Sequence, residues 1–542
     1  MTAQITELSF VGYTQQNSHD DLSKQAITLL RAGNYQTCLE YLHAQPLSLV
    51  ESSAQVLVYL ATAMLFSEYP REKIFSVLSS AESQDDAERV AGEIAAIRAI
   101  IYSYTEDPEE GIRQAKRAFQ LINPKNTFFR NIVERNLGVA YTIKNDLQNA
   151  NYWLERLLMS SYQLKDWGGV LAAYNYLTFI RKVQGRLREA QIIYKKALTF
   201  IADHGLEQMP HSIKIISGYG HLLMYWHHHE EAKAFFQKAI QLAGQTDITY
   251  AYTAYQHLCE TYIREHNFSA AQATLDKIQH CIQGKQDLYE KIHLDHTKRL
   301  ETHLHLETGS FEQANEWLIS SGFDRIQPNK LFAHFGYELG LTLHIASRIY
   351  LLKGMPDRAI EVLKAAIPPF IHQGAHSYLI RALTALAVAY VHIDQHQLAF
   401  NTFERAVGLA QAEDNVGDFL LMGRSLIPLL KLTMQQDNLA EFSFRLINLL
   451  SVSFVERKKL TNSKKHNSAL SSRELDVLSL IADGMTSREI AQTLFLSRNT
   501  IKSHRSNIYR KLEVGTREQA INKAHLLGIL AKHSDTHSWR VT

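Results

Sequence analysis

The residues best suited to molecular recognition lie near the C-terminal end, in the stretch NTIKSHRSNIYRKL at 499–512. A helix over this stretch would turn Lys502, Ser503 and Ser506 away from an apolar stripe. That stripe consists of Ile501, Ile508 and Leu512. Hydroxyl and cationic side chains donate hydrogen bonds and pair with negative charge, so the outer face of this helix suits recognition of a polyanion.

Helix-start signatures define the elements that would position this stretch. A Ser or Thr followed three residues later by Glu or Gln is typical of a capping box, and it occurs at Ser471, Thr486 and Thr516. Ser497 offers a simpler N-cap. The helices implied by these signals span 472–483, 487–495, 498–512 and 517–530. A short helix, a tight turn and a second helix with a cationic outer face indicate a helix-turn-helix.

From Leu470 to Leu530 the sequence resembles the LuxR-type DNA-binding domain over its whole length. The matching residues are LSSRELDVLSLIADGMTSREIAQTLFLS, NTIKSH, NIYRKL, REQA and AHLLGIL. The resemblance implies that the partner is double-stranded promoter DNA and that a homodimer binds it through contacts in the last helix. It also implies activation by contact with RNA polymerase.

The same resemblance implies a role for each residue of the site. Lys502, Ser503 and Ser506 would face base edges in the major groove. Phosphates would be held by Thr486, Ser487, Arg488, Arg498, Thr500, Arg505 and Arg517. The scaffold would be built by Glu489, Ile490, Ala491, Ile501, Ile508 and Leu512. The two serines can donate to or accept from several bases, so they predict no single base preference. We expect the charged side chains of Arg510 and Lys532 to be solvated rather than to contact DNA.

The rest of the chain contains an internal repeat. Seven segments begin with a turn-forming or polar residue and place an alanine five positions later, at intervals of 39 to 45 residues. These alanines are Ala150, Ala190, Ala232, Ala271, Ala314, Ala359 and Ala399. Four positions after them come large apolar residues: Leu154, Tyr194, Phe236, Leu275, Leu318, Leu363 and Phe403. A small residue lets two antiparallel helices approach closely, while the residue four positions on fills the groove between them.

With weaker copies at 33–42 and near Ala115, this pattern predicts about nine helix pairs that bury their apolar faces against their neighbours. It resembles tetratricopeptide repeats in the longer-period form of MalT-type regulators. We therefore expect an all-α fold, with a tetratricopeptide-like helical superhelix followed by a four-helix LuxR-type helix-turn-helix domain. The alternative is an irregular α-helical domain. The expected boundaries are 1–19 for an N-terminal segment, 20–452 for the repeat domain, 453–469 for a basic linker, 470–531 for the helix-turn-helix domain and 532–542 for a tail.

Composition and charge are consistent with this organisation. The 542 residues include only 10 Pro and 25 Gly, as expected of an all-helical chain. The 3 Cys lie far apart, which indicates a reduced, cytoplasmic protein, and no leader or long apolar run predicts export or a membrane span. Residues 456–542 carry 16 Lys and Arg against 8 Asp and Glu, so this end is basic and the remainder mildly acidic.

No motif predicts an enzyme, and no cofactor is expected. MalT-type activators carry an ATPase module before the repeats, but the Gly284-Lys285 pair lacks the Gly and the Ser or Thr of a phosphate loop. Three histidine groupings could offer metal ligands: the triplet 227–229, in a turn between helices, and the pairs His372/His376 and His392/His396. Each pair is spaced as on one helix face, although Gly374 interrupts the first pair. We favour solvated positions for the triplet, and we expect no metal site.

Aromatic residues are abundant on the first helix of each expected pair. They are Tyr174, Tyr176, Tyr219, Tyr225, Trp226, Tyr252, Tyr255, Tyr262 and Tyr390. They could line a groove for a sugar, a hydrophobic effector or a peptide, although a place in the core between repeats is favoured. We expect a bacterial transcription regulator, an activator by resemblance, whose repeat domain senses a small molecule, peptide or protein. The alternative is a repeat-based interaction scaffold whose C-terminal domain no longer binds DNA or serves as an anchor.

Overall fold

The computed structural model describes residues 18–67, 69–104, 107–244, 248–282, 290–331, 339–450, 470, 472–482, 485–493, 497–512 and 514–526. In this part of the chain every regular element is a helix, so the fold class is all-α as expected. None of these helices has the length and apolar character needed to cross a membrane. The chain divides into two compact units, residues 1–180 with 282–295 and residues 181–281 with 296–542.

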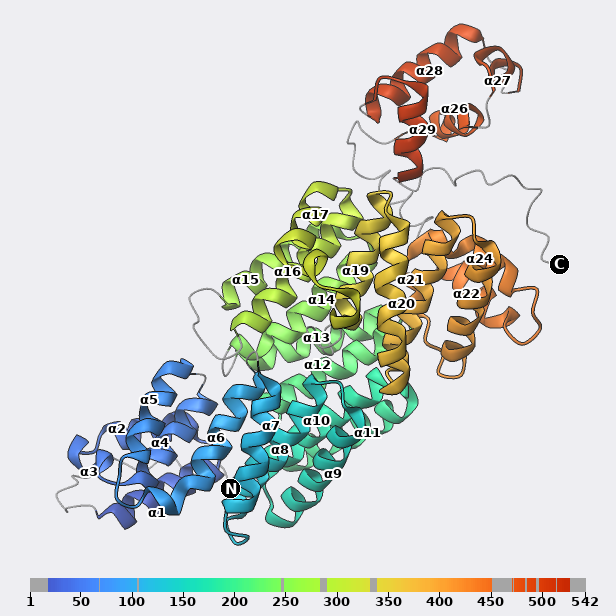
Figure 1. Cartoon of the computed structure of the whole chain (residues 1–542). Helices are drawn as coiled ribbons and strands as arrows, with labels where there is room; N and C mark the ends of the chain where they lie inside the picture. The colour runs from blue at the N-terminus through green and yellow to red at the C-terminus, as the bar shows by residue number, and fades with distance from the viewer. Residues whose placement is uncertain are drawn as a thin grey trace. The chain divides into compact units, whose positions relative to one another are not determined.

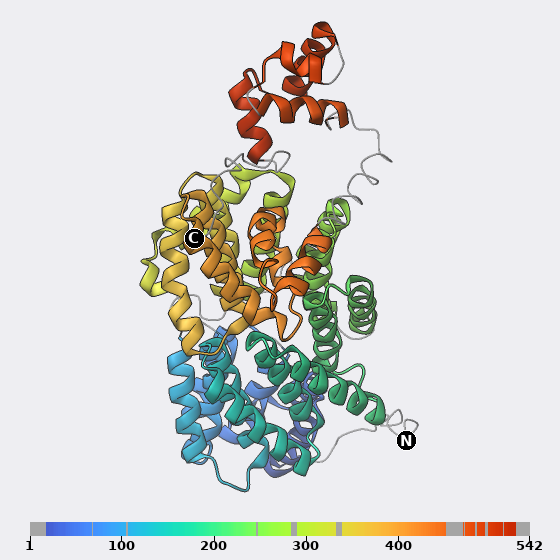
Figure 2. The same cartoon turned by 90° about the vertical axis from the view of Figure 1, so that its right-hand side faces the viewer.

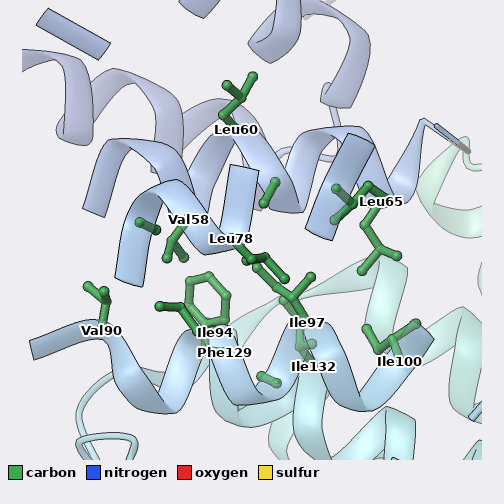
Figure 3. Close-up of a cluster of buried hydrophobic side chains, with 14 of the residues drawn as sticks. Val58, Leu60, Leu65, Leu78, Val90, Ile94, Ile97, Ile100, Phe129 and Ile132 are labelled. Carbon is green, nitrogen blue, oxygen red and sulfur yellow. The ribbon is translucent and has the colours of Figure 1, made fainter. Parts of the chain in front are cut away.

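The first unit consists of antiparallel helix pairs. Its α-helices are α1 (His19–Arg31), α2 (Tyr35–His43), α3 (Leu47–Glu51), α4 (Ala54–Phe66), α5 (Arg71–Glu82), α6 (Ala91–Tyr104), α7 (Pro108–Leu121), α8 (Thr127–Ile143), α9 (Leu147–Leu164) and most of α10 (Trp167–Val183). A 3-10 helix, η1 (Ala87–Val90), precedes α6. Helices adjacent in sequence pack together, as α4–α5, α6–α7 and α8–α9 do. Val58, Leu78, Ile94, Ile97 and Phe129 are buried where α4, α5, α6 and α8 meet (Figure 3).

The second unit also contains antiparallel helix pairs. Its α-helices are α11 (Leu187–His204), α12 (Pro210–Tyr225), α13 (His229–Gly244), α14 (Tyr252–Arg264), α15 (Phe268–Ile282), most of α16 (Glu290–Thr308), α17 (Phe311–Ser320), α19 (Leu339–Leu352), α20 (Pro356–His372), α21 (His376–His392), α22 (His396–Gln411), α23 (Gly417–Leu420) and α24 (Ile427–Thr433). Its 3-10 helices are η2 (Ile248–Ala251), η3 (Phe323–Arg325), η4 (Pro328–Lys330) and η6 (Gly423–Leu426). Pairs such as α12–α13 and α21–α22 lie side by side in both views (Figures 1 and 2).

After α22 the chain returns to the first helices of the second unit. The indole Nε1 of Trp226 donates to the carbonyl of Glu413 at 2.9 Å, and Nη1 of Arg264 donates to the carbonyl of Gly417 at 3.1 Å. Gly417 lies against the backbone of Met224 and Tyr225, at the end of α12. Residues 413–418 therefore pack on α12 and α14, and they bring α23 close to residues that precede it by some 150 to 190 positions.

The predicted column of small residues is confirmed. All seven alanines are fully buried, and so are the large side chains four positions after them. Two of those side chains pack against a glycine on the preceding helix: Leu154 against Gly138 and Phe236 against Gly220. The two helices of these pairs touch at positions where neither side offers room for a larger residue.

The residue five positions before each alanine ends the first helix of its pair in a left-handed conformation. The φ angles are 58° at Asn145, 70° at Gly185, 63° at His227, 57° at His266, 83° at Gly309, 70° at Gly354 and 58° at Asp394. The following backbone N–H donates to a carbonyl five residues earlier, as from His228 to Leu223 at 3.0 Å and from Gln395 to Tyr390 at 3.0 Å. This is the Schellman arrangement, and Gly, Asn, Asp and His are the residues that tolerate it best.

These turns correct the interpretation of the histidine groupings. His372 ends α20 and His376 begins α21, while His392 ends α21 and His396 begins α22. Because a left-handed residue, Gly374 or Asp394, separates the members of each pair, neither pair lies on one helix face. The interruption expected at Gly374 is confirmed, and the expectation of one helix face is wrong for His392 and His396. Within the described ranges, no group of three His, Cys, Asp or Glu side chains is placed to hold a metal ion. Gly284 and Lys285 lie outside the described residues.

The triplet at 227–229 is not uniformly solvated either. His227 occupies the left-handed turn position, and His228 is exposed. His229 is buried, with its Nδ1 at 3.6 Å from a carboxylate oxygen of Glu265. The prediction of a solvated triplet is therefore wrong for His229. Five of the nine aromatic residues named above are buried: Tyr174, Tyr225, Trp226, Tyr252 and Tyr390.

The close helix contact makes a prediction about two glycines in helices of the second unit. A Cβ at Gly220 would lie 2.7 Å from the Phe236 ring and 3.0 Å from the carbonyl oxygen of Ala232, whereas a Cβ at Gly408 would meet nothing within 4 Å. We expect Gly220→Ala to destabilise the protein by about 1–3 kcal/mol through overpacking. We expect Gly408→Ala to stabilise it by about 0.5–1 kcal/mol, because Ala is the better helix former. Melting followed by circular dichroism measures both effects, and shifts of the same sign would contradict the close contact.

Candidate nucleic-acid interface

Four helices form the C-terminal domain: α26 (Ser472–Ala482), α27 (Ser487–Thr493), α28 (Arg498–Lys511) and α29 (Arg517–Leu526). They are grouped in the red part of Figure 1. The predicted helices agree with these bounds except that the third extends one residue further, to Leu512, which is the C-cap of α28. The other predicted residues, 483, 494, 495 and 527–530, lie outside the described part. The buried core comes from these helices and the residue after α28: Val477, Leu478, Ile481, Ile490, Ala491, Ile501, Ile508, Leu512, Ala520 and Ala524. The domain thus has a hydrophobic core of its own.

Side-chain caps fix the starts of α27 and α28. The backbone N–H and hydroxyl of Thr486 donate to Oε2 of Glu489 at 2.7 and 2.8 Å, and the N–H of Glu489 donates back to the Thr486 hydroxyl at 3.4 Å. The hydrogen bonds from Thr486 lower the pKa of Glu489, because they stabilise its carboxylate form. At α28 the Ser497 hydroxyl accepts from the N–H of Thr500 at 3.1 Å. Both predicted caps are confirmed.

The other two predicted capping boxes differ in detail. The Thr516 hydroxyl accepts from the N–H of Gln519 at 3.2 Å, but the Gln519 side chain accepts from Gly515 rather than from Thr516. Ser471 lies outside the described residues. Its expected partner Glu474 is buried, and it accepts a hydrogen bond from Nζ of Lys511 at 2.8 Å. This ion pair links α26 to the end of α28.

The helix α28 turns its apolar stripe inward and its polar residues outward. Ile501, Ile508 and Leu512 are buried. Lys502, Ser503, Ser506 and Arg510 are exposed. The Ser503 hydroxyl donates to the carbonyl of Asn499, one turn earlier, at 3.1 Å. The three residues predicted to face bases therefore lie together on an exposed helical surface, with cationic residues on either side.

The residues predicted to hold phosphates have two kinds of surroundings. Thr486, Arg488, Arg498 and Arg505 are exposed, and Ser487 and Thr500 are partly exposed. Arg505 reaches the Ser487 hydroxyl at 3.5 Å, and the Thr500 and Ser497 hydroxyls are 2.8 Å apart. These groups lie at the start of α27 and along α28.

Arg517 differs from the other predicted phosphate ligands. Its Nη2 donates to the carbonyls of Ile481 and Met485, at 2.7 and 3.4 Å. These bonds connect the start of α29 to the end of α26 and the residues that follow. The role of Arg517 in binding phosphate stays a prediction, and this guanidinium has a structural role that the sequence did not indicate. Like the Glu474–Lys511 pair, it joins residues more than 30 positions apart, so no local pattern could have found it.

Comparison with known proteins agrees with the division into two parts. Residues 92–436 match the MalT-like TPR region, and residues 468–524 match the bacterial regulatory proteins of the luxR family. One relative is the HTH-type transcriptional regulator MalT of Vibrio cholerae serotype O1 (strain ATCC 39315 / El Tor Inaba N16961), 24% identical over 80% of this chain and 49% of that protein. Another is the HTH-type transcriptional regulator MalT of Cronobacter sakazakii (strain ATCC BAA-894), 23% identical over 87% of this chain and 54% of that protein. The chain spans about half the length of these curated relatives.

Among solved structures, the chain is similar to the APC/C hetero-tetramer Cut9–Hcn1, with 13% identity, a TM-score of 0.38 and coverage of 80% of this chain and 90% of that chain. It is also similar to the P58(IPK) TPR domain, with 14% identity, a TM-score of 0.19 and coverage of 73% and 98%. The family matches, which span most of the described helices, are the stronger finding. The chain belongs to the MalT-like tetratricopeptide-repeat family, and it carries a C-terminal helix-turn-helix domain of the luxR family of bacterial regulatory proteins.

Proposed function

We propose that this chain is a transcription regulator that binds double-stranded promoter DNA by placing α28 in the major groove. The observation that carries this proposal is the exposed face of α28, where Lys502, Ser503 and Ser506 lie together. An α-helix fits the width of the major groove, and side chains of these types can contact base edges there. The Ser497 cap supports the proposal further, because it fixes the residue at which α28 begins.

Side-chain length and charge decide which residues we assign to the bases and which to the phosphates. Lys502 is long enough to reach acceptor atoms of guanine, while the two serines require close approach of the helix to the bases. Arg488 on α27 and Arg498 and Arg505 on α28 would hold the phosphate backbone, and such contacts fix the register of the helix. Thr486 and Ser487 at the start of α27 and Thr500 in the first turn of α28 would add hydroxyl or backbone contacts.

We further propose that the repeat region senses a small molecule, peptide or protein and that the signal changes DNA binding. The relatives named as transcriptional regulators support this arrangement, since their similarity extends over 80% and 87% of this chain. A homodimer on DNA would contact itself through α29. Because Ala520 and Ala524 face the core of their own domain, that contact would use the opposite side of the helix. Activation would proceed by contact with RNA polymerase, in the cytoplasm at the nucleoid.

The second candidate is a protein-interaction scaffold in which the C-terminal domain no longer reads sequence. The buried repeat core favours neither candidate, since a solenoid serves sensors and scaffolds equally well. The surface of α28 distinguishes them, because a scaffold does not require Lys502.

Charge reversal at Lys502 tests the base-reading face. We expect Lys502→Glu to weaken binding to the specific site by about 10- to 100-fold or more, because it removes a donor to a base and adds repulsion in the groove. The control is Arg510→Glu, the same change in charge on an exposed residue of the same helix, which should have a much smaller effect. Affinity is measured by fluorescence anisotropy on DNA selected by the wild-type protein, and circular dichroism checks the fold. Equal losses in the two variants would contradict the assignment of Lys502.

Salt dependence tests the phosphate contacts. The logarithm of the association constant should fall linearly with the logarithm of salt concentration, with a slope near −0.9 for each phosphate neutralised. We expect Arg505→Ala to make this slope shallower by about one. Lys73→Ala, which removes an exposed charge on α5, should leave it unchanged. A wild-type slope near zero would show that the domain does not bind DNA through phosphate.

A further inference from the structure

The second unit contains a buried lysine without a carboxylate partner. Lys182, near the end of α10, is 5% exposed. Its Nζ lies 3.1 Å from Nδ1 of His221 on α12, and 5.8 Å from the centroid of the Tyr194 ring. In the described part of the chain no Asp or Glu oxygen lies within ion-pair distance of it. Burying an ammonium group without a counter-ion is costly, so its retention requires a reason.

The carboxylate that acts on Lys182, Glu260, and the one that pairs with neighbouring Arg381, Asp418, are already bonded to other cations. Glu260 on α14 bonds Arg264 at 2.6 Å, and Asp418 on α23 bonds Nε of Arg381 at 2.5 Å. Asp418 also accepts from Ser377 at 3.0 Å and from Asn415 at 2.7 Å. Three cations from α10, α14 and α21 therefore share two carboxylates, and the positive charge left over belongs to Lys182.

Hydrogen-bond donors also exceed acceptors around these helices. Nε of Arg264 and Nη1 of Arg348 are buried, and neither has a hydrogen-bond partner among the described residues. A guanidinium can only donate, so each of these atoms lacks an acceptor. The pKa of His344 on α19 lies well below its usual range, because of burial and the nearby positive charges of Arg348, Arg381 and Arg264. One positive region therefore extends from α14 and α21 to α19.

Several polar side chains in this positive region are partly exposed to solvent. The side chains of Glu260 and Arg348 keep 20% and 19% of their surface exposed, and His221 and His257 are partly exposed as well. The rings of His221 and His257 stack at 4.2 Å, and Nδ1 of His257 lies 3.2 Å from the Ser217 hydroxyl. Polar groups that solvent can reach thus border the buried ammonium.

We propose that Lys182, His221, His257, Arg264 and Arg381, here called the Lys182 cluster, bind the oxyanion group of a small molecule, either a phosphate or a carboxylate. The anion would supply the missing negative charge to Lys182 and an acceptor to the unpaired Nε–H group of Arg264. This molecule would be the signal that the repeat region senses. That last step rests on the proposed function, whereas binding of the anion does not.

The protonation of Lys182 links this binding to pH. Burial and, to a lesser extent, Arg381 lower the pKa of Lys182 to about 7, although Glu260 acts in the opposite direction. The groups that face it do not titrate near pH 7. Burial lowers the pKa of His257 to about 3 and that of His221 well below its usual range. Burial opposes ionisation of Glu260, but Arg264 and Arg381 outweigh it and hold the pKa of that carboxyl at about 2.

The sign of the pH effect follows from these values. A bound anion stabilises the ammonium form of Lys182 and raises its pKa, so binding takes up a proton. Affinity should therefore be highest below pH 7 and should fall by about tenfold between pH 6.5 and 8.5. Sulfate and malonate are suitable probes because neither titrates in this range. Sulfate represents a phosphate group and malonate a carboxylate.

The test measures the melting temperature of the full chain against probe concentration, with ionic strength held constant by sodium chloride. In the wild type at pH 6.5 we expect a saturable rise with at least one probe, and the probe that binds more tightly identifies the type of oxyanion. Lys182→Gln should weaken the apparent affinity at least tenfold. Lys195→Gln, the same substitution at an exposed lysine on α11, should leave it unchanged. No saturable rise with either probe, or an equal rise in Lys182→Gln, would overturn the proposal.

Two further measurements keep the test decisive. Should Lys182→Gln fail to fold, the wild-type affinity at pH 6.5 and 8.5 replaces it, and an affinity independent of pH overturns the proposal. Lys502→Glu separates this inference from the proposed function, because that variant should lose specific DNA binding and keep the saturable response to the anion. A protein that responds to the anion but binds no specific DNA would refute the proposed function alone.

Discussion

The close contact between the two helices of each repeat is the constraint on which the repeat region depends. The small residue that permits this contact is an alanine in each of the seven copies, and every one of these alanines is fully buried. Where the helices are this close, two of the large side chains four residues on pack against a glycine of the facing helix: Leu154 against Gly138 and Phe236 against Gly220. The turn five residues before each alanine must then reverse the chain tightly, which explains its left-handed φ. The buried alanine, the large side chain four residues on and the left-handed turn therefore recur together in each copy of the repeat. Each copy buries its apolar face against its neighbours.

The C-terminal domain satisfies a different requirement. It is small, and its core comes from four short helices. One face of α28 must nevertheless stay exposed, without packing against the rest of the domain. Its stability is therefore provided elsewhere: by the stripe of Ile501 and Ile508, the caps at Thr486 and Ser497, and the buried pair of Glu474 and Lys511. This separation lets Lys502, Ser503 and Ser506 remain exposed side by side, which is the arrangement that our proposal for DNA recognition requires.

Structural features that depend on residues close together in sequence could be predicted. Contacts between residues far apart in sequence could not. The alanine column and the inward stripe of α28 follow from helical periodicity alone, and two of the capping signatures formed as expected. The turn at His227 could be predicted from its alignment with Gly185 and Asn145 in the repeat. The burial of His229 could not, because it depends on the approach of Glu265 after α14. The bonds of Arg517 to Ile481 and Met485 required knowledge of how α29 packs on α26. Lys182 and Arg381 lie 199 positions apart, and their helices meet because Gly185, just after α10, lies against His376 at the start of α21.

The central claim is that the C-terminal domain reads DNA sequence. The most direct test is selection from a random library of double-stranded DNA by the purified full-length protein, followed by sequencing after several rounds. The account predicts enrichment of one motif with two similar half-sites in inverted orientation, as expected of a dimer that places one α28 in each half-site. A final pool with no motif above the starting library would contradict it, and would favour a repeat scaffold whose C-terminal domain does not recognise DNA sequence.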